Sequence, residues 1–442
     1  MRDFAVSDDP RVQAQLDRLG TLSVPQGRIG LDAIRALLER LGNPQRRLPP
    51  TFHVAGTNGK GSTCAFLRAA IEASGKRVHV FTSPHLVRFN ERIRLAGQLV
   101  TDGMLADLLA EVLDVAEQAG ISASFFEVST AAAMLAFARE PADACIFEVG
   151  LGGRFDATNV IEAPVVCGIA SLGIDHEAFL LAPDPLAPQQ PHARIAFEKA
   201  GIAKAGVPLV TLDYGFGENE AIAAHAKAVG APWQRRNRDW SIGPTRDGFR
   251  YSDARGLLHL PRPRLPGNHQ VVNAGLAIAM LRHQDVVPVP DSALVAAMDW
   301  ARWPARLQKL GEGPLTALLP ADTPVWLDGG HNPDAGKALS MHFRGHTTRI
   351  HLVIGMLANK NPAALVGPLA DRLVSLTVVP VPGHADQPRE AFELSLAPEP
   401  SSAPDVASAL KSLDITKGDI VLIAGSLYLA GTVLRENGEL PD

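Results

Sequence analysis

The chain alternates short apolar runs with longer stretches in which apolar residues recur at helical spacing. The clearest runs, rich in β-branched residues, are FHVAG (52–56), RVHVFT (77–82), ACIFEVG (144–150) and PVVCGIA (164–170). Runs of this length predict strands buried on both faces. The segments between them, such as STCAFLRAAIEASG, begin with hydroxyl residues and end at glycine, as capped helices do. Buried strands separated by helices predict a parallel sheet, whose ligands bind beyond the carboxyl ends of the strands.

The pattern changes after about residue 205 and then returns. WQRRNRDWSIG and GFRYSDARGLLHL predict a small antiparallel excursion, which is followed by the helix VVNAGLAIAML. A proline-rich stretch then indicates a hinge. From residue 320 onward, strands and helices alternate again, with strands in PVWLDGG, RIHLVIGM, SLTVVPVPG and DIVLIAGS. We therefore predict a first α/β domain over residues 1–287, a hinge linker at 288–300 and a second, smaller α/β domain over 301–442.

Composition narrows the class of protein. A chain of 442 residues is too long for one ordinary core, which agrees with two domains. The formal net charge of -5 provides no global basic field, so we expect no nucleic-acid partner. No apolar stretch of about 18 residues occurs and the N-terminus lacks an apolar signal region, so we expect a cytoplasmic protein without a membrane partner. Cys64, Cys145 and Cys167 lie far apart in apolar runs, which predicts buried free thiols.

The segment GTNGKGS, residues 56–62, follows the first predicted strand and precedes a helix. A glycine-rich turn between strand and helix directs several backbone N–H groups at one point, which makes an anion site. Lys60 would add a mobile positive charge for phosphates, and Ser62 or Thr63 would cap the helix or lie near a metal. The alternative is an ordinary Gly/Asn turn with a solvated lysine. The usual phosphate-loop pattern has a hydroxyl residue directly after the lysine, whereas this chain has Gly61 there.

Two strand ends carry groups that could hold a metal ion. Glu148 lies in an otherwise apolar run near the carboxyl end of a predicted buried strand. A carboxylate buried there without a partner would cost several kcal/mol, which a divalent cation would relieve. The alternative is a glutamate that pairs with arginine or turns into solvent. Asp175 and His176 end the strand that begins at 164, where His176 could supply a second ligand. Together with the glycine turn, these residues predict an ATP–metal site.

Six motifs in this chain are similar to those of a known family. They are GTNGKGS, TSPHLVRFNERIR (82–94), EVGLGGRFDATN (148–159), IDH (174–176), EKAGI (198–202) and DGGHNP (328–333). In order and spacing they resemble folylpolyglutamate synthase and the bifunctional dihydrofolate synthase, which belong with the Mur ligases. The resemblance covers residues from about 20 to the C-terminus. A glycine after the lysine is the form that the phosphate loop takes in this family.

The resemblance implies a Mur-ligase-like fold, with an N-terminal P-loop ATP-binding parallel-sheet domain, a smaller C-terminal Rossmann-like domain and catalysis in the cleft between them. It implies an ATP-dependent ligase that adds L-glutamate to dihydropteroate and to reduced folates through an acyl phosphate, acting as a monomer. ATP and Mg²⁺ are the implied cofactors, with a second divalent or monovalent cation. Three alternatives stay open: an enzyme restricted to polyglutamylation, an idle nucleotide-binding regulator of the same fold, and a Mur-type ligase that uses a UDP-sugar. The motifs FNERIR and EKAGI favour folate over the last of these.

The resemblance also implies roles for particular residues. The nucleotide phosphates would be held by Asn58, Gly59, Lys60, Gly61 and Ser62, with adenine at Asn273, ribose at Asp328 and the terminal phosphates at Arg306. Metal ligands would be Ser83, Glu148, His176 and a carbamylated lysine (N6-carboxylysine) at Lys199. The catalytic set is then Lys60, His176, Lys199 and Arg306. Without the family, Lys199 would be interpreted as a surface lysine.

The expected acceptor site combines two segments, with a further pair of residues in the second domain. Pterin contacts would come from Ser124, Phe125, Phe126, Glu127, Phe155, Asp156 and Ala157. The alternative for the phenylalanines is ordinary core packing. His331 and Ser426 are expected to contact glutamate or the phosphates. This chain departs from the family by a proline-rich insertion at 180–192, which is predicted to be a loop, and by Asn359 and Asn361 beside Lys360, which puts a role for Lys360 in doubt.

Overall fold

The computed structural model of the chain describes residues 6–22, 30–344 and 349–442. The chain forms two compact units. The first runs to Arg264 and resumes over Gln270–Arg302, and the second comprises Leu265–His269 and Trp303–Asp442. In the described part of the chain, no helix is both long enough and apolar enough to serve as a membrane span.

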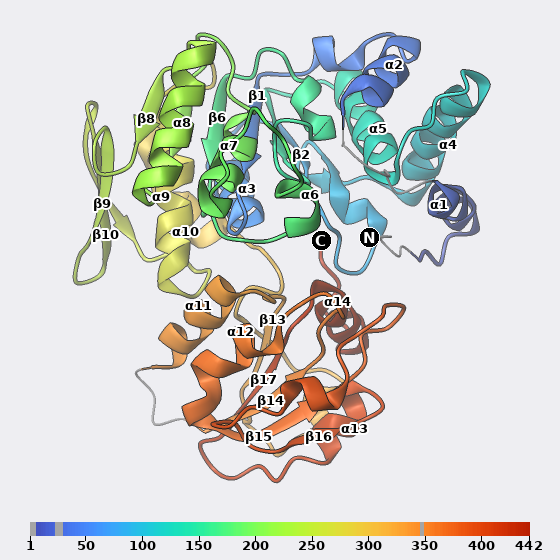
Figure 1. Ribbon diagram of the computed structural model, residues 1–442, viewed down its shortest axis with the longest axis vertical. Helices are drawn as coiled ribbons and strands as arrows, with labels where there is room; N and C mark the ends of the chain where they lie inside the picture. The colour runs from blue at the N-terminus through green and yellow to red at the C-terminus, as the bar shows by residue number, and fades with distance from the viewer. Residues whose placement is uncertain (1–5, 23–29, 345–348) are drawn as a thin grey trace. The chain divides into compact units, whose positions relative to one another are not determined.

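The first unit is built on an eight-stranded sheet in the order β4-β3-β2-β5-β1-β6-β7-β8 (Figure 1). Its strands are β1 (Thr51–Ala55), β2 (Val78–Phe81), β3 (Ile93–Leu95), β4 (Gln98–Leu99), β5 (Ala144–Glu148), β6 (Val166–Ile169), β7 (Leu209–Thr211) and β8 (Trp233–Arg235). All neighbours from β2 to β8 are parallel, whereas β3 and β4 are antiparallel. The four strands predicted from apolar runs are therefore confirmed as β1, β2, β5 and β6.

The predicted antiparallel excursion is a separate three-stranded sheet of β9 (Trp240–Pro244), β10 (Gly248–Asp253) and β11 (Gly256–Pro261). The helices that begin in the first unit or lie within it are α1 (Pro10–Thr21), α2 (Asp32–Arg40), α3 (Lys60–Ala73), α4 (Asp102–Gln118), α5 (Phe125–Arg139), α6 (Glu177–Leu180), α7 (Pro191–Ala200), α8 (Phe216–Val229) and α10 (Asp291–Trp300). Helix α9 (Asn268–Arg282) starts with two residues of the second unit and continues in the first. Short 3-10 helices are η1 (Pro44–Arg47), η2 (Phe89–Arg92) and η3 (Ala157–Val160).

The segment predicted as a hinge linker, 288–300, is mostly helical. Asp291–Trp300 forms α10, which packs against α3 within the first unit. Its buried residues Ala293, Leu294, Ala297 and Met298 recur at helical spacing and form one apolar face. The prolines before residue 291 only start the helix, because proline is compatible with the position that precedes a first turn.

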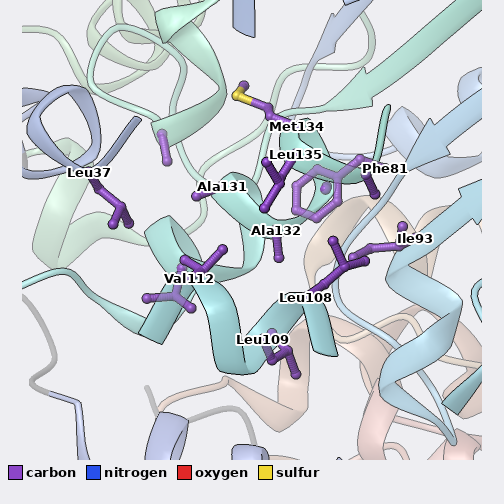
Figure 2. Packing of buried hydrophobic residues seen from close by; sticks show 14 of the residues in the cluster. Leu37, Phe81, Ile93, Leu108, Leu109, Val112, Ala131, Ala132, Met134 and Leu135 are labelled. Atoms are coloured by element: carbon purple, nitrogen blue, oxygen red, sulfur yellow. The ribbon is translucent and has the colours of Figure 1, made fainter. Parts of the chain in front are cut away.

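Two apolar clusters cover one face of the large sheet. In the first, residues of α4 and α5 cluster with Phe81 of β2 (Figure 2). Phe147 of β5 belongs to the same cluster. In the second, Cys167 and Ile169 of β6 pack against the side-by-side helices α7 and α8 (Figure 1). All three cysteines are free and buried, as predicted. The loops that follow β1, β5 and β6 begin at the carboxyl ends of these strands.

The second unit has a six-stranded sheet in the order β12-β13-β17-β14-β15-β16. Its strands are β12 (Gln308–Lys309), β13 (Val325–Asp328), β14 (Ile350–Ile354), β15 (Leu373–Val378), β16 (Pro400–Ser402) and β17 (Ile420–Ala424). Its remaining helices are α11 (Pro333–Phe343), α12 (Pro362–Val366), α13 (Val406–Lys411), α14 (Leu427–Glu436), η4 (Thr316–Leu318), η5 (Gly367–Arg372) and η6 (Arg389–Phe392). Only β12 is antiparallel to its neighbour, so the predicted second α/β sheet is confirmed.

Candidate active site

The turn between β1 and α3 presents an uncapped helix N-terminus. Gly59, with φ of 83°, is the N-cap of α3; no side chain caps the helix, and its first turn contains no acidic residue. The first N–H groups of a helix have no partner within it, and the helix dipole favours negative charge there. Lys60 lies at the same point and donates to the main-chain oxygen of Thr57 (3.3 Å). An anionic group would therefore meet both N–H donors and an ammonium ion.

Asn273 of α9 lies directly beside this turn. A Cβ atom at Gly59 would overlap the side-chain oxygen of Asn273, so the two residues are in close contact. The amide nitrogen of Asn273 donates to the side-chain oxygen of Gln270 (3.0 Å), which orients it. Asn273 is more than 200 residues from the glycine turn along the chain, and the fold brings the two together.

Glu148 and Ser83 meet at the ends of neighbouring strands. Glu148 ends β5 and is 4% exposed, and its carboxylate accepts a hydrogen bond from the main-chain N–H of Ser83 (3.2 Å). Because β5 pairs with both β1 and β2, the residues after those strands converge on one edge of the sheet. The Glu148 charge also lies close enough to Cys64 in α3 to raise the pKa of that thiol further, in addition to the larger effect of burial. A buried carboxylate near the uncapped α3 terminus is a suitable donor for a divalent cation.

His176 lies in the loop after β6, at the start of α6. His176 is the N-cap of α6, but its side chain does not cap the helix. Its main-chain N–H donates to the Asp175 carboxylate (2.8 Å), and its side chain is exposed. Its role as a ligand of a second metal stays a prediction. Among the residues that the structure describes, no group of three or more His, Cys, Asp or Glu side chains is arranged to bind a metal. The predicted metal ligands include only two residues of these types, Glu148 and His176.

Lys199 is not a surface residue, contrary to the interpretation from local sequence. It is 4% exposed on α7, and its Nζ donates to the main-chain oxygen of Gly56 in the glycine turn (3.0 Å). Burial, and next the positive charge of Lys60, lowers the pKa of Lys199 to about 7. Three carboxylates oppose this shift: those of Asp175, Asp156 and Glu198. The apolar face of α7, which packs into the sheet, carries the lysine inward.

The SFFE segment starts helix α5 and forms a capping box. The Ser124 hydroxyl accepts from the N–H of Glu127 (3.3 Å), and the Glu127 carboxylate accepts from the N–H of Ser124 (2.8 Å). This reciprocal pair satisfies two helix donors, so both residues have a structural role that the sequence analysis did not assign. Phe125 lies edge-on to Phe89 with ring centroids 5.9 Å apart. Phe126 packs directly on Gly150, because a Cβ atom there would overlap its ring.

The loop that contains Phe155, Asp156 and Ala157 is organised by Asp156. This carboxylate is 4% exposed and accepts from the N–H of Leu151 (2.8 Å) and from the N–H (3.0 Å) and hydroxyl (2.5 Å) of Thr158. Burial raises the pKa of Asp156, and these hydrogen bonds oppose that rise. Phe126 contacts Gly150, which precedes Leu151, so the start of α5 lies beside the loop that Asp156 organises.

In the second unit, Arg306, Asp328 and Ser426 lie around the carboxyl ends of β13 and β17. Asp328 accepts from the N–H groups of Leu307 (2.8 Å) and Gly330 (2.7 Å). Ser426 caps α14 by accepting from the N–H of Tyr428 (3.1 Å). Asp328 of β13 pairs with Ala424 of β17, so Ser426, two residues after Ala424, lies at the same edge of the sheet. His331 lies near them, with its Nδ1 3.1 Å from the main-chain oxygen of Gly329.

Comparisons with known proteins agree with this arrangement. The family description "Mur ligase, glutamate ligase domain" matches residues 316–427. A dihydrofolate synthase/folylpolyglutamate synthase of Bacillus subtilis is 33% identical over 427 residues, covering 92% of this chain and 94% of the relative. The chain belongs to the folylpolyglutamate synthase/dihydrofolate synthase family. This membership confirms the resemblance seen in the six motifs.

Solved structures of this family share the fold. E. coli FolC in complex with DHPP and ADP superposes with a TM-score of 0.83 at 31% identity, covering 97% of both chains. A bifunctional folylpolyglutamate synthase/dihydrofolate synthase with Mn, AMPPNP and L-glutamate bound has a TM-score of 0.83 at 29% identity, covering 98% of this chain and 99% of the other. The predicted Mur-ligase-like α/β fold is thereby confirmed.

Three residues of this synthase-family chain were missed by sequence reasoning. His269 lies near Asp328 and Arg306, and its pKa is lowered by burial, with Arg306 adding to the shift and Asp328 opposing it. His53 of β1 contacts the Thr158 hydroxyl through Nε2 (2.8 Å) and supports the Asp156 loop from inside the sheet. Arg154 binds two acidic residues at once. The polar run NHQ at the start of helix α9 and the histidine within an apolar strand were the available signals.

Proposed function

We propose that this chain is an ATP-dependent ligase that joins L-glutamate to dihydropteroate and to reduced folates. The observation that carries the proposal is the uncapped α3 terminus with Lys60, placed beside the buried Glu148, in a chain of this family. A nucleoside triphosphate with its cation requires an anion site next to a carboxylate that can bind the metal. Relatives with solved structures bind ADP, AMPPNP, Mn, DHPP and L-glutamate, and we carry these ligand classes to this chain.

The nucleotide would lie with its phosphates on the α3 turn, formed by Asn58, Gly59, Lys60, Gly61 and Ser62. Asn273 is the residue of α9 that touches this turn, which supports a contact with the nucleotide. In the second unit, Arg306 and Asp328 are proposed for the terminal phosphates and the ribose. His331 and Ser426 are proposed for L-glutamate or the phosphates.

Glu148 and Ser83 are proposed to hold Mg²⁺, with His176 and a carbamylated Lys199 completing the cation sites. The oxygen donors of Glu148, Ser83 and a carbamate at Lys199 would suit a hard cation next to a phosphate site, and His176 would add one imidazole nitrogen. When bound, the cation neutralises charge that develops on the transferring phosphoryl group. Lys60 and Arg306 contribute positive charge of the same kind from the chain itself.

The reaction follows from the poor electrophilicity of a carboxylate. An acceptor carboxylate oxygen attacks the γ-phosphorus of ATP, and the bond from that phosphorus to the β,γ-bridging oxygen breaks. ADP departs, and the acceptor becomes an acyl phosphate. The free amine of L-glutamate then attacks the acyl carbon, phosphate departs, and one proton is released. Preorganised donors lower the barrier most where this charge develops. Phe125, Phe126, Phe155 and Ala157 are proposed as pterin contacts, and Ser124, Glu127 and Asp156 hold their two segments in place.

The environment of Lys199 supports carbamylation. An amine reacts with carbon dioxide only in its neutral form, and a pKa of about 7 leaves a large neutral fraction at neutral pH. The nitrogen attacks the carbon of CO₂ and loses a proton, which produces a carbamate with oxygen donors for a cation. The measurement is a carbon NMR spectrum of protein equilibrated with ¹³C-bicarbonate. A carbamate resonance that is lost in Lys199→Arg and kept in Lys204→Arg supports the modification, and its absence from the native protein contradicts it.

The function is tested by ADP release from purified protein supplied with ATP, Mg²⁺ and L-glutamate. ADP release that occurs with dihydropteroate and also with tetrahydrofolate, but not without an acceptor, supports the bifunctional ligase. Release with tetrahydrofolate alone would replace the proposal by a polyglutamylation-only enzyme. If neither acceptor leads to ADP release, although nucleotide binding is measurable, the result would favour the idle regulator. We further propose that the protein acts as a monomer, which its sedimentation would check.

A further inference from the structure

The proline-rich segment, residues 180–192, is held in a defined place by one buried arginine. Arg194 of α7 is 6% exposed, and its guanidinium donates to three main-chain oxygens of the segment. The acceptors are those of Leu180 (3.1 Å), Ala182 (3.1 Å) and Asp184 (3.5 Å). Five donors in a rigid fork allow one arginine to hold several carbonyls in one geometry. The predicted loop therefore has a fixed path on α7.

Asp184 joins this segment to the Arg154 loop through charge. Its carboxylate accepts from Nη2 of Arg154 at 2.6 Å and lies 3.9 Å from Nη2 of Arg194. Glu198 of α7 binds the same two arginines, at 2.8 Å and 3.3 Å. The four side chains carry two charges of each sign, and the most exposed of them, Arg154, is 17% exposed. Removing one member of such a set leaves the others as uncompensated buried charges.

Arg154 connects these four charged side chains to the proposed acceptor loop. Its guanidinium carbon lies 4.4 Å from the centroid of the Phe155 ring, and its main-chain N–H donates to the oxygen of Glu198 (2.8 Å). On the other side, a Cβ atom at Gly152 would come within 2.9 Å of a methyl carbon of Leu180. The loop that carries Phe155 and Asp156 is thus held between α7 and the proline-rich segment.

We propose that Asp184 is a positioning residue for the pteridine-bearing acceptor. By completing the counter-charge of Arg154, it fixes the loop of residues 150–157 and so the surface offered to the flat ring of the acceptor. The inference rests on the proposed function for the identity of the acceptor. The Asp184 carboxylate binds Arg154, which in turn lies over Phe155 in the acceptor loop, so its effect should fall on acceptor binding rather than on the nucleotide.

The test compares Asp184→Asn with Asp285→Asn in the full-length chain. Both remove one carboxylate charge that is paired with arginine, but the Asp285 side chain is 89% exposed, against 4% for Asp184. For Asp184→Asn we expect the KM for dihydropteroate to rise about five- to tenfold, because misplacing a supporting group weakens a preformed site. The KM for ATP and kcat should change by less than about twofold. Asp285→Asn should leave all of them unchanged.

A second measurement does not depend on activity. Hydrogen exchange of the peptide spanning residues 150–157 should become faster in Asp184→Asn than in the native protein or in Asp285→Asn. If the native protein lacks ligase activity, the proposed function fails while this exchange result still tests the positioning role. Arg194→Gln is measured in parallel, in case the first variant does not fold, and should show the same exchange and the same KM selectivity. Unchanged exchange, or an equal loss in every kinetic constant, would overturn the inference.

Discussion

Lys199 shows how burial changes the chemistry available to one side chain. A lysine in EKAGI has no local reason to leave the surface, yet α7 buries it against the glycine turn. Desolvation disfavours the ammonium form, and the nearby Lys60 adds repulsion, which together bring the pKa to about 7. A strongly lowered pKa makes Lys199 a candidate functional residue, and this property follows from its position rather than from its residue type.

Lys60 is the residue whose removal should stop the reaction with least effect on folding. In Lys60→Ala we expect turnover to fall by about a hundred- to thousandfold, because one preorganised charge at the phosphates is lost. Its hydrogen bond to the main-chain oxygen of Thr57 contributes only about 1 kcal/mol to folding. The measurement is ADP release together with a thermal melt. The control is Lys227→Ala on the surface of α8, and near-normal rates in Lys60→Ala would remove the phosphate-loop assignment.

His53 should make the protein less stable in acid. Burial, with the charge of Lys204, lowers its pKa from 6.5 to about 3 in the folded chain. Between these values the unfolded chain binds a proton that the folded chain does not, so the free energy of unfolding falls as the pH drops from 6.5 towards 3. The slope attributable to this one group is about 1.4 kcal/mol per pH unit.

Urea denaturation of native protein and His53→Gln across this pH range measures the difference in slope. The variant should lose less stability on acidification, and the exposed His192→Gln should behave as the native protein does. Parallel curves for His53→Gln and the native chain would show that His53 does not titrate in this way.

At the scale of the element, α3 has two different ends. Its N-terminus begins at Gly59, which touches Asn273, and its C-terminus is followed by Gly75, with φ of 79° and no atom near its Cβ position. The helix is buried along most of its length and is held in place by packing. Gly59, which has a close neighbour, and Gly75, which has none, therefore provide a matched pair of positions for substitution.

Gly59→Ala and Gly75→Ala should separate backbone strain from loss of the anion site. Each alanine would adopt a left-handed conformation at a cost of about 1–2 kcal/mol. Only Gly59→Ala would also displace Asn273, so we expect that variant alone to lose nucleotide affinity, by about tenfold or more. Calorimetric titration with ADP, together with denaturation curves, gives both quantities. Equal ADP affinities in the two variants would contradict the placement of Asn273 at the nucleotide.

At the scale of the whole molecule, the chain has separate hydrophobic cores. Among the described residues, the cluster around α4 and α5 and the cluster around β14 share no member. Compact units with their own cores can unfold in separate steps, so one melting temperature need not describe the protein.

Leu109→Ala in α4 and Leu352→Ala in β14 should therefore act on different units. Both side chains are fully buried, and each substitution should cost about 2–5 kcal/mol. Hydrogen exchange followed by mass spectrometry should show lost protection within the first unit for Leu109→Ala and within the second for Leu352→Ala. A uniform loss over the whole chain in either variant would show that the units unfold together.

Local sequence determined which segments form the elements and where the glycine turn lies. Apolar β-branched runs, hydroxyl caps and terminal glycines act over a few residues, so the strands from β1 to β17 that had clear patterns were predicted close to their observed bounds. The motif GTNGKGS specified a turn and an exposed helix N-terminus for the same reason. The six motifs together were specific enough to indicate the family, which the comparisons confirmed.

Only the tertiary structure decided which distant side chains meet. β5 lies between β1 and β2, which brings Glu148 to Ser83, and α7 packs so that Lys199 reaches Gly56. The same packing buries His53 and closes the charges of Arg154, Asp184, Arg194 and Glu198 into one network. Burial and pairing depend on neighbours more than 100 residues away in several of these cases. A local pattern contains no information about such neighbours, so these properties could not be predicted from it.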